Sequence, residues 1–184
     1  VITPGLGADI ITSGSGSDVI NLTETVESQD TVHLVPDQSN GIDTVTGFTV
    51  GNGNDIIGFN VTAWNSAIGQ LENPLDSSAI AANDAEAFIA FNGTANITHG
   101  AGANTGNIIH VTATNLTAVS GITASVAFNA NTGADDGLPM IWYDSDDEFM
   151  QVGLWVNDDT DATLDDTTSF LPLANFSMDA ATYG

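Results

Sequence analysis

Short apolar groups alternate with turns rich in glycine and aspartate over residues 1–60. Ile10-Ile11 and Val19-Ile20 are each followed by a polar residue, and Ile56-Ile57 repeats the pattern later in the chain. Short β-branched groups bounded by Gly and Asp predict β-strands joined by tight turns. We expect Ile11 and Ile20 to face a narrow core between two sheets, while their neighbours alternate outward.

The pattern changes near Val61, where longer β-like runs replace the regularly spaced glycines. The alternation predicts strands, followed by a final apolar segment, at Asn107–Thr114, Ile122–Phe128, Met140–Tyr143, Gln151–Val156 and Phe170–Met178. Met140–Tyr143 and Gln151–Val156 flank the acidic, turn-like Asp144–Glu148, which predicts a hairpin. Asp76–Phe91 alone has a helix-favouring composition, so a short helix is expected there. The sequence therefore predicts an all-β protein with a first region at 1–60 and a second at 61–184.

The first region contains an internal repeat. Pro4–Thr12 aligns without gaps on Ser13–Asn21, at an offset of nine residues. The matched positions are Gly5 with Gly14, Gly7 with Gly16, Asp9 with Asp18, and Ile11 with Ile20. A third copy contains Gly51, Gly53 and Asp55, and two looser copies contain Asp30 and Asp43. Each unit is long enough for one turn and one short strand, so two units form one coil of the chain.

The repeated residues are suited to binding calcium. Glycine allows backbone angles closed to other residues, and aspartate adds a charged oxygen at the end of the turn. Calcium takes six to eight oxygen ligands at roughly 2.3–2.6 Å, which two stacked turns could supply and one could not. The alternative for Asp9 and Asp18 is a pair of ordinary Gly-Asp hairpin turns. The candidate Ca²⁺ ligands are Gly5, Gly7, Asp9, Gly14, Gly16, Asp18, Asp30, Asp43, Gly51, Gly53 and Asp55.

The pattern x-Gly-x-Gly-x-Asp-x-Ile-x resembles the calcium-binding nonapeptide repeat of RTX, or haemolysin-type, proteins. The match departs at the first glycine of that repeat, where Pro4 and Ser13 stand here. Gly41–Phe59 resembles the segment that closes such repeats in serralysin-type proteases and bacterial surface-layer proteins. Ile141–Asp144 and Leu171–Phe176 resemble the C-terminal strands of the same modules.

The resemblance implies a short parallel β-roll at 1–60, followed by a β-sandwich-like C-terminal domain at 61–184. It also implies that turns one coil apart share each calcium ion. Asp18 would then share an ion with a turn near Asp43 or Asp30, and Asp9 would share one with the other. Asp55 would close the last site.

The large excess of acidic residues adds a further constraint on the fold and its partners. The chain has 24 Asp plus Glu and no Lys or Arg, so its formal net charge is -24. Every carboxylate must be solvated, hydrogen-bonded, protonated or bound to a cation. Self-repulsion of this size destabilises the compact state, and bound divalent cations would relieve it. The lack of basic side chains excludes nucleic acid and anionic membrane surfaces as partners, and no apolar run is long enough to span a membrane.

Nothing in the sequence indicates a catalytic centre. His33, His99 and His110 are scattered, and no His-Glu-x-x-His motif or cysteine exists. Carboxylate pairs could serve a glycosidase, but with this many acids pairs arise by chance. We therefore expect a protein that is not an enzyme.

Two other groups of residues have an ordinary and a functional interpretation. The acidic runs Asp144–Glu148, Asp158–Asp161 and Asp165-Asp166 could bind extra calcium, although such runs are more often solvated loops. Trp142, Tyr143 and Trp155 are expected in the core. If exposed, they would mark a subunit contact or a platform for a cell-surface glycan.

The functional hypothesis is a calcium-stabilised, extracellular or cell-surface structural module of a bacterial surface protein. It would act as a surface-layer or filament subunit and form a homo-oligomer or polymer. One alternative is the C-terminal export and folding module of a type I-secreted enzyme, such as a protease or lipase. Another is an adhesin-like module that recognises sugar or another cell.

Overall fold

The computed structural model describes residues 1–35, 41–51, 54–59, 88–91, 97–99, 108–122, 126–128, 137–156, 163–164 and 170–183. Within these ranges the regular structure is mostly β, as the sequence predicted. Helical structure there is limited to a 3₁₀ turn, η1 (Val119–Gly121), and one turn of α-helix, α2 (Ala180–Tyr183).

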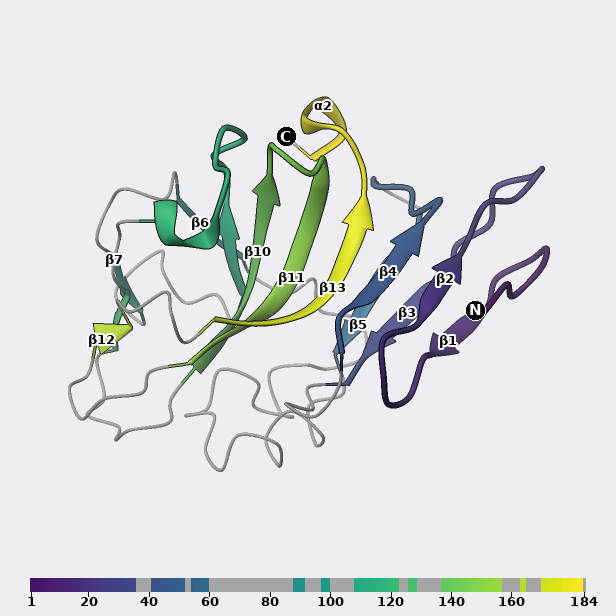
Figure 1. The fold of residues 1–184 in the computed structure, drawn as a ribbon, viewed down its shortest axis with the longest axis horizontal. Coiled ribbons are helices and arrows are strands. Elements are labelled where there is room, and N and C mark those ends of the chain that lie inside the picture. The colour runs from purple at the N-terminus through teal and green to yellow at the C-terminus, as the bar shows by residue number, and fades with distance from the viewer. Residues whose placement is uncertain are drawn as a thin grey trace.

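In the first region, successive strands alternate between two sheets (Figure 1). The strands are β1 (Ile10–Thr12), β2 (Val19–Asn21), β3 (Thr31–Leu34), β4 (Asp43–Thr46) and β5 (Ile56–Phe59). Odd-numbered strands form a parallel three-stranded sheet in the order β1-β3-β5. The even-numbered β2 and β4 pair in parallel at one end of a second, seven-stranded sheet.

The seven-stranded sheet continues from the first region into the second. Its order is β2-β4-β13-β11-β10-β8-β6, with a separate small sheet β12-β9-β7. The second-region strands are β6 (Phe88–Phe91), β7 (Ile97–His99), β8 (Ile108–Val111), β9 (Val126–Phe128), β10 (Gly137–Asp144), β11 (Phe149–Val156), β12 (Thr163–Leu164) and β13 (Phe170–Ser177). β13 pairs in parallel with β4, so the two regions share one sheet. The expected boundary at Val61 lies outside the described residues.

The core of the first region follows the predicted alternation. Ile11 and Ile20 are 5% and 0% exposed, whereas Ile10 and Val19 are 77% and 43% exposed. Both buried isoleucines belong to one apolar cluster that also contains Phe176 of β13. The inward orientation predicted for Ile11 and Ile20 is therefore confirmed, and their apolar cluster extends into the second region.

Most strand predictions for the second region are confirmed, with shifted ends. The hairpin is formed by β10 and β11, in which Asp144 pairs with Phe149 around the acidic turn. The other predictions correspond to β8, β9 and β13, although residues 123–125 lie outside the described part of the chain. The helix expected at Asp76–Phe91 is wrong at its end, because Phe88–Phe91 forms β6 and pairs in parallel with β8. Packing beside β8 favours strand there over local helix preference.

Successive coils approach so closely that glycine is required at their crossing points. Gly47 has φ +78°, and a Cβ there would lie 2.5 Å from the backbone nitrogen of Thr23. A Cβ at Gly58 would lie 2.6 Å from Nδ1 of His33. At Gly47 both the backbone angle and the available space exclude a side chain.

We expect Gly47→Ala to lower the free energy of unfolding by about 2–4 kcal/mol, because it adds left-handed strain and an overpacked contact. Gly121→Ala is the matched control. A Cβ at Gly121 would meet only Leu116 Cδ2 at 3.2 Å, and the residue has no positive φ. Chemical denaturation should show a loss below about 1 kcal/mol for the control. Equal losses in the two variants would contradict the close coil packing.

Candidate metal centre

Three aspartates lie in register, each at the position directly before a strand of the parallel three-stranded sheet. The backbone N–H of Asp9 donates to Oδ1 of Asp30 at 2.9 Å. The N–H of Asp30 donates in turn to Oδ1 of Asp55 at 2.8 Å. We call Asp9, Asp30 and Asp55 the first carboxylate column. The carboxylates of Asp30 and Asp55 each join one coil to the coil before it.

Asp18 and Asp43 repeat this arrangement at the seven-stranded sheet and form the second carboxylate column. The N–H of Asp18 donates to Oδ1 of Asp43 at 2.9 Å. The hydroxyl of Ser13 donates to the other oxygen of Asp43. The structure thus selects Asp43 as the neighbour of Asp18 and Asp30 as the neighbour of Asp9, a choice that the sequence left open.

Asp55 holds the last turn of the first column. Its Oδ2 accepts the backbone N–H of Thr49 at 2.8 Å and the Thr49 hydroxyl at 3.1 Å. Together with the bond from Asp30, this carboxylate accepts three hydrogen bonds. Asp55 therefore organises its own turn as well as the junction between coils.

The repeat glycines adopt the conformations expected of them. The values of φ are +115° at Gly5, +103° at Gly7, +85° at Gly14, +100° at Gly16 and +121° at Gly51. At the first four positions an added Cβ would meet no atom within 4 Å, so the backbone angle alone requires glycine. Gly53 lies outside the described residues.

The first column concentrates negative charge in a buried place. Asp30 is only 1% exposed, and burial is the main cause that raises its pKa above the usual value. The charges of Asp55, Glu24 and Asp9 raise that pKa further, against the bond from the Asp9 N–H. A buried carboxylate among other carboxylates is costly unless a cation or further donors compensate it.

Some carboxylate oxygens in this area have no compensation from the protein. Oδ2 of Asp9 and both carboxylate oxygens of Glu24 are shielded from solvent and accept no hydrogen bond. Glu24 was not among the predicted ligands, because the turn that contains it lacks the Gly-x-Gly element. Spacing gives no signal for this residue, and only the burial of its carboxylate identifies it.

The candidate ligands are oxygen atoms of carboxylates and, by position, of the turn backbones. No group of three or more His, Asp or Glu side chains in the described part of the chain forms a metal cage by itself. A calcium ion here would therefore need carbonyl oxygens beside one or two carboxylates, which calcium accepts readily. The uncompensated oxygen of Asp9 fits this requirement.

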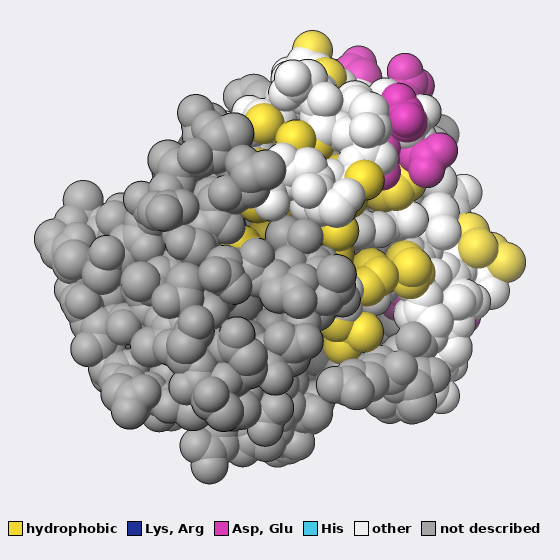
Figure 2. Space-filling view, turned by 60° about the vertical axis from the view of Figure 1, so that its left-hand side comes forward, with side chains coloured by type: hydrophobic (Ala, Val, Ile, Leu, Met, Phe, Trp, Pro, Cys, Tyr) yellow, Lys and Arg dark blue, Asp and Glu magenta, His cyan; other side chains and the backbone are white. Residues whose placement is uncertain are grey.

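The acidic hairpin tip has a structural role of its own. Oδ1 of Asp144, which is 8% exposed, accepts the N–H of Asp146 at 3.0 Å. The side chain thus stabilises the turn between β10 and β11. The runs Asp158–Asp161 and Asp165-Asp166 lie outside the described residues. Figure 2 shows acidic side chains gathered over one part of the described surface, and the chain has no Lys or Arg to pair with them.

The three aromatic residues of the hairpin lie in the core. Trp142, Tyr143 and Trp155 are 2%, 2% and 0% exposed. The indole N–H of Trp142 donates to Oε1 of Gln151 at 3.1 Å. Core packing is therefore confirmed for these residues, and they form no exposed platform for a glycan.

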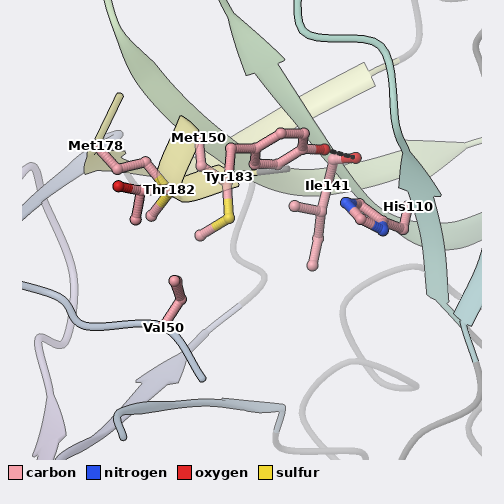
Figure 3. Close-up of a pocket in the computed structure, with 7 residues that line it drawn as sticks. All are labelled: Val50, His110, Ile141, Met150, Met178, Thr182 and Tyr183. Carbon is pink, nitrogen blue, oxygen red and sulfur yellow. Dashed lines mark hydrogen bonds between the residues drawn. The ribbon is translucent and has the colours of Figure 1, made fainter. Parts of the chain in front are cut away.

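An apolar pocket of about 300 Å³ lies near the C-terminus (Figure 3). It is lined by Val50, His110, Ile141, Met150, Met178, Thr182 and Tyr183. The Tyr183 hydroxyl donates to the carbonyl oxygens of Val111 at 2.6 Å and of Ile141 at 3.3 Å. Burial lowers the pKa of His110. Among these lining residues no carboxylate or nucleophile accompanies His110 and Thr182, so they do not form a hydrolytic constellation.

Comparisons of the chain with protein-family models, with characterised proteins and with solved structures gave no match. In the described residues no helix is long and apolar enough to cross a membrane.

We expect Asp55→Ala to lower the free energy of unfolding by about 2–4 kcal/mol, because it removes an acceptor of three hydrogen bonds and leaves their donors unpaired. Glu27→Ala removes an equal charge from an exposed position and should change stability by less than about 0.5 kcal/mol. Urea unfolding of both variants checks this expectation. A mild effect of Asp55→Ala would show that the first column does not hold the coils together.

Proposed function

We propose that residues 1–60 form a parallel β-roll that binds calcium along the two carboxylate columns. The single observation that supports this best is the register of Asp9, Asp30 and Asp55 on stacked turns. The same register recurs for Asp18 and Asp43. Ordinary hairpin turns would not align the carboxylates of aspartates that are 21 and 25 residues apart in the sequence. The sandwich-like cap at 61–184 stays a prediction.

Calcium suits these columns better than other common metals. Oxygen donors from carboxylates and carbonyls match a hard cation, whereas zinc prefers Cys and His ligands. The chain has no Cys, and no His belongs to either column. Magnesium demands a rigid octahedron of ligands, which turns with loosely spaced donors do not favour.

Bound calcium would also neutralise the negative charge that the fold buries. The chain has no Lys or Arg, so no ion pair with those side chains can neutralise the buried carboxylates, whereas a bound cation would. Extracellular calcium modules bind with dissociation constants of about 10⁻⁴–10⁻³ M. Such sites would be filled outside a cell and largely empty in its cytosol, so the coils would order after export.

The module then serves as a calcium-stiffened structural unit of a bacterial surface assembly. Ile10 and Ile56 are 77% and 44% exposed, and β3 places them in register on the outer face of the three-stranded sheet. Exposed aliphatic side chains on a sheet favour association with another surface. We therefore propose a homo-oligomeric, non-enzymatic role at the cell surface.

Calcium should raise the stability of chelator-treated protein. A site with a dissociation constant of about 10⁻⁴ M adds about 2.7 kcal/mol at a hundredfold excess of calcium over that constant. Asp9→Asn and Asp18→Asn should each lose part of this gain, since each removes a charged oxygen from one column. Thermal unfolding at several calcium concentrations measures the effect, with sodium chloride of equal ionic strength as the control. If sodium and calcium act alike, screening rather than binding explains the gain.

Calcium should also promote assembly. Electron microscopy and light scattering of the chain with calcium should show ordered polymers or sheets, and chelation should disperse them. The double variant Ile10→Ser and Ile56→Ser should bind calcium normally and assemble less. A protein that stays monomeric at millimolar calcium would contradict the assembly role while leaving calcium binding intact.

A further inference from the structure

Glu24 has a buried carboxylate that no repeat motif explains. The residue lies in the turn between β2 and β3, and both of its carboxylate oxygens are shielded from solvent without a hydrogen-bond donor. A buried carboxylate without a donor is costly unless a partner from outside the chain, such as a cation, compensates its charge.

The position of this turn in the stack identifies where that partner lies. The bonds from Asp9 to Asp30 and from Asp30 to Asp55 place the turn of Glu24 between the turn before β1 and the turn before β5. The charges of Glu24 and Asp9 both act on Asp30, so each of the two carboxylates lies near Asp30. Oδ2 of Asp9 is likewise buried and without a donor.

The length of the turn explains why an acid is available there. Asp9 and Asp30 are 21 residues apart, which exceeds twice the nine-residue offset of the repeat. The extra residues lie between β2 and β3, where the Gly-x-Gly element is missing. A carboxylate from the longer turn would replace oxygens that the missing glycine turn would otherwise present.

We propose that Glu24 is a calcium ligand and that, with Asp9, it completes an ion site between the first two turns of the first column. The inference rests on the proposed calcium function and adds a ligand outside the nonapeptide motif. Two carboxylates neutralise one Ca²⁺ ion, and turn carbonyls complete the coordination shell. One ion at this site compensates the buried oxygens of both residues.

Glu24→Gln tests the proposal in the full chain, since glutamine keeps the shape and removes the charge. Calorimetric titration of chelator-treated protein with calcium chloride should show one site lost or weakened by tenfold or more. Glu27→Gln makes the same change at an exposed position of the same turn and should titrate like the unmodified chain. If Glu24→Gln also titrates like the unmodified chain, Glu24 is not a ligand.

Two further measurements separate ligation from other roles. Without calcium, Glu24→Gln should unfold at the same or a higher temperature than the unmodified chain, because a buried charge is gone. A lower temperature would indicate a structural role and overturn the proposal. Glu24→Asp keeps the charge but shortens the side chain, so the carboxylate is withdrawn and calcium affinity should also fall. Unchanged affinity would show that Glu24 contributes only its charge and is not a ligand. Absence of any calcium binding by the unmodified chain would instead refute the proposed function itself.

Discussion

A hydrogen bond from a backbone N–H to the carboxylate of the next coil sets the geometry of the whole first region. It occurs between Asp9 and Asp30, between Asp30 and Asp55, and between Asp18 and Asp43. Each bond aligns the start of one strand with the start of its neighbour, so register and turn position are fixed together. The same bonds also bring like charges together in a chain without Lys or Arg. Order and repulsion therefore come from the same atoms, and a bound cation would remove the repulsion while keeping the order.

This constraint explains where glycine is required. The turns before β1 and β2 need left-handed angles but have free space, as at Gly7 and Gly16. Gly47 has a left-handed angle too, but there the neighbouring coil also fills the space beside it. The sequence shows both kinds simply as glycine. Only the first kind belongs to the repeat, while the second is required by the short distance between stacked coils.

The parts that the sequence predicted correctly are local. The short strands, the inward Ile11 and Ile20 and the glycine conformations follow from a nine-residue pattern that is complete within each turn. The pairing of turns depends on how many residues each coil contains, and the separations of 21 and 25 residues are irregular. Glu24 could not be found at all, because burial of a carboxylate depends on neighbouring coils. The helix expected before β8 failed for a similar reason, since strand pairing outweighed composition at Phe88–Phe91.

The second carboxylate column connects the turns to the rest of the molecule. Asp43 is the first residue of β4. It pairs with Ala174 of β13, while its side chain accepts a hydrogen bond from the backbone N–H of Asp18. Phe48, just after β4, packs edge to face against Phe176 of β13, with the two ring centroids 4.8 Å apart. Loss of order at Asp43 would therefore loosen the pairing of β4 with β13 and expose part of the shared core. A cation on that column would act on the seven-stranded sheet as a unit, because β4, which the column aligns with β2, also pairs with β13 of the second region. For this reason we expect the two regions to unfold together and not as independent domains.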